Sequence, residues 1–212
     1  MEYQRAEAIV LRRQPVTESS LIVTWFTREF GKLKTLAKGA RRSKGPFVGK
    51  IDLFYEDEIV WLTSRRSDLH LLHDCFLVHP HPQLRVSVTA MTAAAYACEL
   101  VELGTEVEDA HPRVYELLAA LLGTLEEKVS GTVLVWFELQ VLAALGWTPK
   151  WETGTVTGKL LASLAGATPA GARRVRLSAA QLRDARDALW LFSDAQLGRS
   201  PRSRKLLLET MP

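Results

Sequence analysis

The stretch SLIVTWFTREFGKLKTLAKGARR, residues 20–42, decides how the N-terminal part of the chain folds. It contains two runs of β-branched, aliphatic and aromatic residues, 20–27 and 32–37, separated by turn residues that include Gly31. Such runs are typical of short β-strands. Three further runs of this kind lie at 8–12, 52–62 and 69–78. Five closely spaced strands predict an antiparallel barrel or a small sandwich, and a segment of about 80 residues suits a five-stranded OB-type barrel.

The sequence pattern becomes helical after Pro82. Apolar residues recur at three- and four-residue steps over 86–101, and again from Pro112 to Leu125. The segment 132–145 is apolar on nearly all sides, so we expect a buried helix there. Two more helices are predicted, over 179–197 between an N-cap Ser178 and a closing Gly198, and over 202–210.

The predicted fold class is therefore a multi-domain α+β protein. An OB-fold β-barrel is expected over 1–80 and an α-helical domain over 81–212. Residues 150–176 are rich in Gly, Thr, Ala and Ser with little periodicity, which predicts an irregular insertion of loop or poorly ordered strands.

The net charge of +3 hides a strong asymmetry along the chain. Residues 1–80 carry 13 Lys and Arg against 10 Asp and Glu, residues 81–149 carry 3 against 9, and residues 150–212 carry 11 against 5. Attraction to phosphate depends on local charge. Basic ends around an acidic middle therefore predict a nucleic-acid binder whose contacts lie on its ends.

Two clusters of basic residues are the candidate nucleic-acid-binding sites. The first lies on the second strand of the opening stretch and the loop after it, and no acidic residue interrupts it: Lys32, Lys34, Lys38, Arg41, Arg42, Lys44 and Lys50. The second follows a helix C-terminus: Arg199, Arg202, Arg204 and Lys205. The alternatives are a solvated basic hairpin for the first cluster and helix capping for the second. Aromatic residues of the barrel could stack on bases, but most are expected in its core.

Other classes of function lack their motifs. No segment is long and apolar enough for a membrane span, no secretory leader pattern opens the chain, and two cysteines, Cys75 and Cys98, suit a reducing cytoplasm as buried residues. The segment 154–160 lacks the spacing of a Walker phosphate loop, and His70 and His73 should face opposite sides of a strand. We therefore predict no catalytic residues, no cofactor and no metal.

Several short motifs resemble one family. They include Ala8-Ile9-Val10-Leu11-Arg12-Arg13, Phe26-Thr27-Arg28-Glu29-Phe30-Gly31-Lys32, Ala37-Lys38-Gly39-Ala40-Arg41-Arg42 and Leu197-Gly198-Arg199-Ser200-Pro201-Arg202-Ser203-Arg204. Together they resemble the bacterial RecO family of recombination mediators over nearly the whole chain. The resemblance implies an OB-fold followed by a helical domain, binding of single- and double-stranded DNA, and strand annealing without ATP hydrolysis. It also implies RecR and the C-terminal tail of the single-strand binding protein as partners, RecA as an indirect partner, and a cytoplasmic, nucleoid-associated location.

The chain departs from this family at one place. Many members carry a four-cysteine zinc module where this chain has Gly154-Thr155-Val156-Thr157-Gly158, and the cysteine ligands are absent here. We therefore expect no zinc and a shortened or loosely packed segment. An alternative function also stands, namely an OB-fold adaptor that binds RNA or protein peptides through its helical domain and does not anneal DNA.

Overall fold

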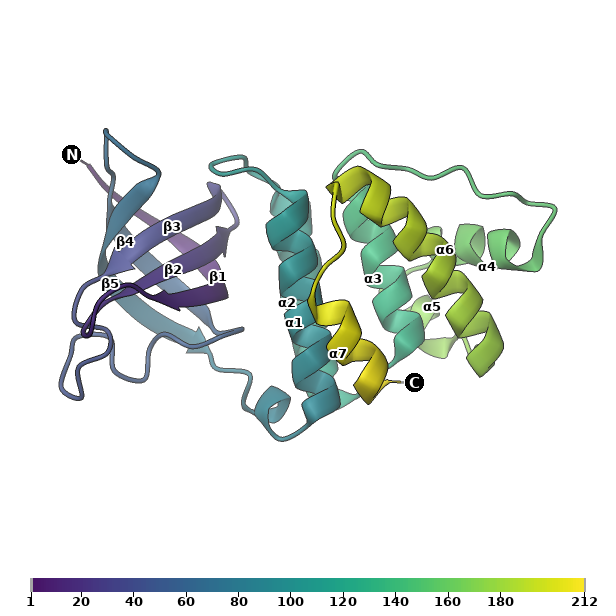
Figure 1. The fold of residues 1–212 in the computed structure, drawn as a ribbon, viewed down its shortest axis with the longest axis horizontal. Helices are drawn as coiled ribbons and strands as arrows, with labels where there is room; N and C mark the ends of the chain where they lie inside the picture. Colours follow the sequence, from purple (N-terminus) through teal and green to yellow (C-terminus); the bar gives the residue numbers. More distant parts are fainter. Residues whose placement is uncertain (1, 212) are drawn as a thin grey trace. The chain divides into compact units, whose positions relative to one another are not determined.

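The computed structural model describes residues 2–211 and contains an N-terminal β-barrel and a set of helices (Figure 1). The chain divides into two compact units. The first comprises residues 1–82 and 105–122, and the second comprises 83–104 and 123–212. No helix within the described residues is long and apolar enough to cross a membrane.

Five strands form the closed barrel of the first unit, in the order β1-β2-β3-β5-β4. All neighbours are antiparallel except β3 and β5, which pair in parallel over three residues. The predicted five-stranded OB-type barrel and the helices after it are thus confirmed. The strands are β1 Tyr3–Pro15, β2 Leu21–Thr27, β3 Gly31–Ala37, β4 Glu56–Leu62 and β5 Leu69–His79.

The alternation of β3 creates a barrel interior and a solvent-facing row. Gly31, Leu33, Thr35 and Ala37 are buried, while the residues between them are partly exposed. Inside the barrel, the Trp25 indole donates a 2.8 Å hydrogen bond to the Thr35 hydroxyl. Buried apolar side chains from all five strands pack around this pair.

One predicted strand begins later than the sequence indicates. The segment 52–55 is a turn, because Phe54 has a φ of 70°, which no regular strand residue adopts. The backbone of this turn still bonds to β1, since Phe54 N donates to Val10 O and Val10 N donates to Tyr55 O. β4 therefore starts at Glu56.

In the second unit, helix α3 lies at the centre and packs against four other helices, α1, α4, α5 and α6. Residues 132–139 of α3 are all buried, as its apolar composition predicts. The 3-10 helix η1 spans Pro82–Arg85, and α2, Pro112–Glu127, crosses the boundary between the units. The remaining helices are α1 Val88–Gly104, α3 Gly131–Ala144, α4 Val156–Ala165, α5 Pro169–Arg174, α6 Ala179–Leu197 and α7 Ser203–Thr210.

Helices α4 and α5 occupy the segment for which the sequence predicts loop or poorly ordered strands. Each begins at a threonine cap, with the Thr155 side chain accepting from Gly158 N and the Thr168 side chain accepting from Gly171 N. Leu161 and Leu164 of α4 are buried against α3 and α6. Capping and burial thus stabilise short helices that their glycine content disfavours.

The caps of α6 agree with the prediction. The Ser178 hydroxyl accepts from Gln181 N, the Gln181 side chain accepts from Ser178 N, and Gly198 ends the helix with a φ of 69°. This capping box and left-handed glycine fix both ends of the helix.

Candidate nucleic-acid interface

The outward face of β3 carries a row of lysines, as the alternation predicts. Lys32 and Lys34 are partly exposed, and Lys38 just beyond the strand is exposed. Lys32 is engaged, because its Nζ donates to Thr105 O at 2.5 Å. No hydrogen bond or ion pair within residues 2–211 engages the side chains of Lys34 and Lys38, so both ammonium groups can attract an anion.

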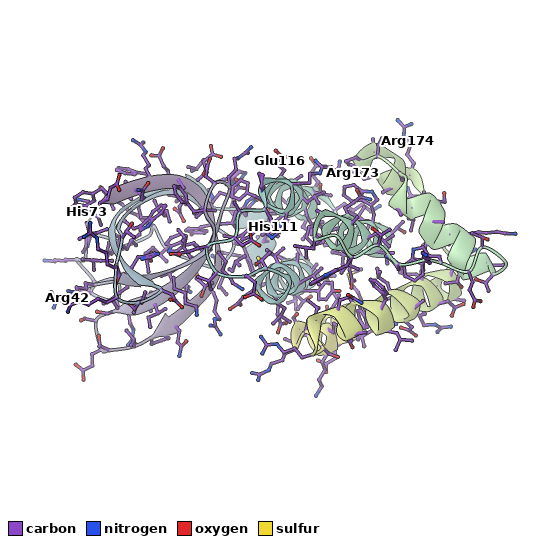
Figure 2. All side chains as sticks on the ribbon, turned by 90° about the horizontal axis from the view of Figure 1, so that it is seen from above. Arg42, His73, His111, Glu116, Arg173 and Arg174 are labelled. Carbon is purple, nitrogen blue, oxygen red and sulfur yellow. The ribbon has the colours of Figure 1, made fainter. Side chains whose placement is uncertain are left out.

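The turn after β3 presents the next basic residues. Gly39 has a φ of 75° and its carbonyl accepts from Arg42 N, which closes a tight turn. The Arg41 guanidinium donates to Thr17 O at 2.8 Å and thereby ties this turn to the β1–β2 loop. The Arg42 side chain projects outward from the barrel (Figure 2), and among the described residues neither Arg42 nor the exposed Lys44 has an ion-pair partner.

Lys50 differs from Lys34, Lys38, Arg42 and Lys44 because its ammonium group has an ion-pair partner. Its Nζ is 3.5 Å from an Asp74 carboxylate oxygen and 5.5 Å from the centre of the Phe76 ring. Much of its charge is therefore balanced within the barrel.

A groove of about 600 Å³ opens beside the turn after β3, and we name it groove A. Its walls come from the end of β1, the start of β2 and the long β3–β4 loop, and they include Arg13, Arg41, Arg42, Phe47, Asp52 and Tyr55. The one carboxylate in this set, Asp52, forms an ion pair with Arg13, which also donates to Ile51 O at 2.9 Å. Groove A thus combines some apolar side chains with the positive charge of Arg41 and Arg42, neither of which has an ion-pair partner among the described residues.

A second groove of about 740 Å³, groove B, lies between the end of β3 and the β4–β5 loop. Leucines form its floor and basic residues its rim, and its lining includes Leu36, Lys38, Leu62, Arg65, Arg66 and Leu71. No acidic side chain of the described residues lines it. Arg65 and Arg66 are not among the predicted site residues; the pattern Ser64-Arg65-Arg66-Ser67 between two strands is the signal that would have indicated them.

His70 fixes the base of the loop that carries these two arginines. It is buried, and its Nδ1 accepts a hydrogen bond from Ser64 N at 3.2 Å. Because Nδ1 accepts, Nε2 carries the proton and donates to the Glu108 carboxylate at 2.9 Å. His73, by contrast, is exposed, so the prediction that these histidines face opposite sides is confirmed.

An acidic segment, 105–111, covers the start of β3, and we call it the acidic connector. Val107 forms a parallel bridge with Lys32, and Glu108 N donates to Lys32 O at 2.9 Å. The approach is so close that a Cβ on Gly31 would lie 1.9 Å from Asp109 O. The exposed side chains of Glu106, Glu108 and Asp109 place negative charge at this end of β3, so a phosphate group would be attracted more strongly to the opposite end.

The aromatic residues of the barrel are mostly in its core, as predicted. Trp25, Phe26, Phe47 and Phe54 are all buried, whereas Phe30 and Tyr55 are partly exposed. Tyr55 lines groove A. Among the aromatic residues considered, Tyr55 is therefore the one placed beside the basic residues of groove A where it could stack on a base.

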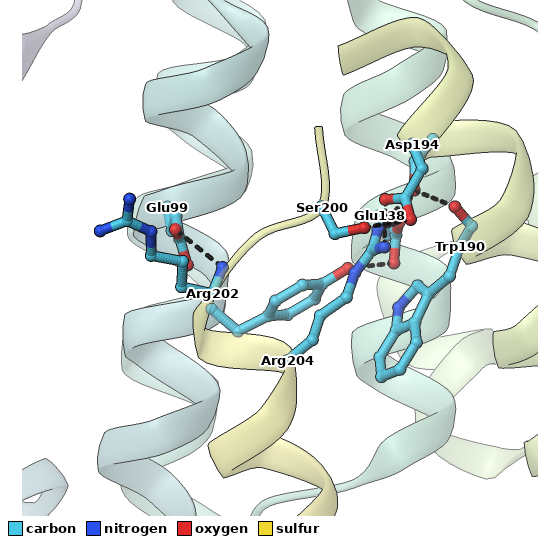
Figure 3. Close-up of polar contacts among 9 residues, drawn as sticks. Glu99, Glu138, Trp190, Asp194, Ser200, Arg202 and Arg204 are labelled. Atoms are coloured by element: carbon cyan, nitrogen blue, oxygen red, sulfur yellow. Dashed lines mark hydrogen bonds and ion pairs between the residues drawn. The ribbon is translucent and has the colours of Figure 1, made fainter. Parts of the chain in front are cut away.

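The second predicted cluster separates into exposed and buried residues. Arg199, Arg202 and Lys205 are exposed. Arg204 is buried: it forms ion pairs with Asp194 and Glu138, its guanidinium donates to the Ser193 hydroxyl at 2.6 Å, and it lies 4.7 Å from the Trp190 ring centre (Figure 3). Arg204 thus anchors α7 inside the second unit.

Two carboxylates on neighbouring helices complete this anchor. Glu138 is fully buried, and burial raises its pKa although the Tyr96 hydroxyl donates to it at 2.5 Å. Glu99 accepts from Arg202 N and Ser203 N at 2.9 and 2.8 Å (Figure 3). Burial opposes ionisation of Glu99, but these hydrogen bonds outweigh it and lower its pKa.

The barrel interior holds one unusual polar group, the Asp57 carboxyl. Asp57 is 1% exposed, and neither of its oxygens has a hydrogen-bond partner among the described residues. Burial raises its pKa to about 7, against an opposing contribution from the neighbouring Cys75 thiol. Burial also raises the pKa of that thiol, and Cys75 and Cys98 are both buried as predicted. A sealed carboxyl beside a protonated thiol has no route to a substrate.

The segment that replaces the zinc module does not fit a zinc ion. Residues 150–176 contain no cysteine or histidine. The Thr155 hydroxyl caps α4 by accepting a hydrogen bond from Gly158 N at 3.0 Å. No thiolate or imidazole is available there to bind the metal.

Comparisons with known proteins agree with the fold. Residues 1–81 match the family model "Recombination protein O N terminal" and residues 85–163 match "Recombination protein O C terminal". The cluster at 199–205 lies outside both matches.

Three curated relatives, each named "DNA repair protein RecO", show the extent of the similarity. The protein of Chloroherpeton thalassium is 33% identical over 82% of this chain and 68% of its own length. The proteins of Syntrophus aciditrophicus and Rhodopirellula baltica are 32% and 34% identical over 68% and 72% of this chain. Those alignments span 56% and 57% of the two relatives, so this chain matches little more than half of their length.

Proposed function

The chain belongs to the RecO family of DNA repair proteins, and on that basis we propose that it is a recombination mediator that works without catalysis. In this proposal it binds single- and double-stranded DNA and promotes the pairing of complementary strands. With RecR it assists the loading of RecA onto DNA coated by the single-strand binding protein, whose C-terminal tail it contacts. We place this activity in the cytoplasm, at the nucleoid.

The set of free cations around the end of β3 is the observation that supports DNA binding. Within the described residues these side chains have no ion-pair partner: Lys34, Lys38, Arg42, Lys44, Arg65 and Arg66. Arg42 lines groove A, and Lys38, Arg65 and Arg66 line groove B. Each phosphate that they neutralise releases counterions, so binding should weaken steeply as salt rises and should depend little on sequence. The exposed Arg199, Arg202 and Lys205 are proposed as a second, smaller contact.

Mechanistically, these residues hold strands and leave their bonds intact. Arginine and lysine neutralise the backbone, which reduces the repulsion between two strands and allows their bases to meet. The apolar side chains that line the grooves, such as Phe47 in groove A and Leu36 in groove B, favour contact with unpaired bases over contact with water. Pairing then follows from base complementarity.

A triple substitution tests the proposal. The variant Lys38→Ala with Arg41→Ala and Arg42→Ala should bind a labelled oligothymidylate at least about 10-fold more weakly at low salt, with a shallower salt dependence. The matched control removes three exposed cations from the second unit: Lys150→Ala, Lys159→Ala and Arg183→Ala. Fluorescence anisotropy over a salt series provides the measurement.

Two results would contradict the proposal. Unchanged affinity in the triple variant would show that the surface around the end of β3 is not where DNA binds. Preferential binding of an RNA oligonucleotide over DNA of the same sequence in a competition gel shift would favour the adaptor function instead.

A further inference from the structure

Grooves A and B are separate binding surfaces on one barrel. No described residue lines both of them. The end of β3 lies between them, where Ala37 is buried and pairs with Leu21 of β2. The chain emerging from this strand faces groove B through Lys38 and groove A through Arg41 and Arg42.

We propose that the two grooves hold two DNA strands at the same time, one in each, on a single copy of the chain. This inference rests on the proposed function, because it assigns two places to the DNA that the barrel is proposed to bind. It goes further in predicting that one chain captures two strands that are not paired to each other.

The distribution of charge favours two strands over one. Two DNA backbones repel each other, so a site that brings them together needs cations between them. The turn 38–42 supplies three, Lys38, Arg41 and Arg42, at the boundary between the grooves. Groove B has a further pair on its far rim, Arg65 and Arg66.

Each groove is also equipped to hold a strand independently. Groove B has a leucine floor and three free cations, and it contains no carboxylate among the residues described. Groove A has Phe47 and Tyr55 in its wall, and its single carboxylate is neutralised by Arg13. Apolar surface for bases beside positive charge for phosphates is the combination that binds single strands without sequence preference.

The walls of both grooves are held in place before DNA arrives. Arg41 bonds to Thr17 O, and His70 bonds to Ser64 N at the base of the Arg65–Arg66 loop. Preformed walls reduce the ordering cost of binding. Two strands held on one chain meet at a high effective concentration, which would accelerate their annealing.

Matched charge reversals separate the grooves. Arg42→Glu alters groove A alone, Arg66→Glu alters groove B alone, and Arg183→Glu on α6 is the control. All three side chains are exposed and form no ion pair within residues 2–211, so the variants should fold, which circular dichroism verifies.

Two oligothymidylates with different fluorophores test for double occupancy, because they cannot pair with each other. Energy transfer should appear on adding the wild-type chain, and native mass spectrometry should find one chain with two strands. Each single-groove variant should keep one-strand affinity within about 10-fold of wild type. It should lose the two-strand complex, and it should anneal complementary strands at least about 10-fold more slowly.

The outcomes distinguish this inference from the proposed function. A wild-type chain that saturates at one strand, with both variants weakening that binding equally, would indicate one continuous track and overturn the inference while DNA binding stands. A wild-type chain that binds no oligonucleotide at low salt would overturn the proposed function itself.

Discussion

Replacing Asp57 by asparagine should change how the stability of the barrel depends on pH. The Asp57 carboxyl lies in the barrel interior, 1% exposed, and its oxygens have no hydrogen-bond partner among the described residues. Ionising it there leaves an unpaired charge in an apolar core, so the folded state favours the protonated form.

The magnitude follows from the shift in pKa. Burial raises the pKa of Asp57 from 3.8 to about 7. The folded state therefore holds a proton that the unfolded state releases between these two values. The contribution of Asp57 to stability is therefore full below pH 3.8, falls as the pH rises, and levels off above pH 7. At about 1.4 kcal/mol per unit, the loss across this range is up to about 4 kcal/mol.

The Asp57→Asn variant lacks this titration. It should be more stable than wild type at pH 8, by up to about 4 kcal/mol, and the two proteins should converge towards pH 4. Cys75 provides a probe of the barrel alone, because it is buried there. In a Cys98→Ala background, labelling of the Cys75 thiol over a urea series at each pH measures the unfolding free energy of the barrel, with the rate for the unfolded chain as reference.

Asp68→Asn is the matched control. Asp68 is exposed in the β4–β5 loop, so its loss should leave the pH profile unchanged. Parallel pH profiles for wild type and Asp57→Asn, or a variant less stable than wild type at pH 8, would refute the reasoning that an unpaired carboxylate destabilises the core.

Two further variants test the second unit and the acidic connector. Arg204→Met removes the cation that pairs with Glu138 and leaves that carboxylate buried without it. The free energy of unfolding should fall by about 3–5 kcal/mol, which thermal or urea unfolding measures. The exposed Arg199→Met serves as its control, and equal stability of the two variants would show that the buried pair contributes nothing. Glu106→Gln with Asp109→Asn removes two exposed negative charges at the start of β3, and oligothymidylate affinity at low salt should rise roughly 2- to 5-fold. A decrease, or a gain that persists at high salt, would count against electrostatic repulsion.

Local sequence patterns predict the strands and helices whose formation depends on residues close together in the sequence. Alternation identifies β3, a serine and a glycine identify both ends of α6, and an apolar run identifies α3 as the central helix. Helices α4 and α5 are missed, because glycines weaken their pattern and their stability depends on threonine caps and on burial against α3 and α6.

The candidate site depends on partners distant in the sequence, which limits prediction. The sequence shows that the basic residues of 32–44 form a cluster. It does not predict that Lys32 bonds to Thr105 O or that Arg204 is buried against Glu138, because these partners meet only in the folded chain. Arg65 and Arg66 join the surface only because β5 pairs with β3 and brings the β4–β5 loop beside Lys38.

The barrel unit is discontinuous in the sequence, since it comprises 1–82 and 105–122. During translation, the ribosome delivers all five strands before the acidic connector that covers Gly31 and contacts Lys32 and His70. Translation adds about 5–20 residues per second, so roughly 2 to 8 seconds pass between the synthesis of residue 82 and that of residue 122. Helix α1 is synthesised within that interval, ahead of α3 and α7, which later pack on it.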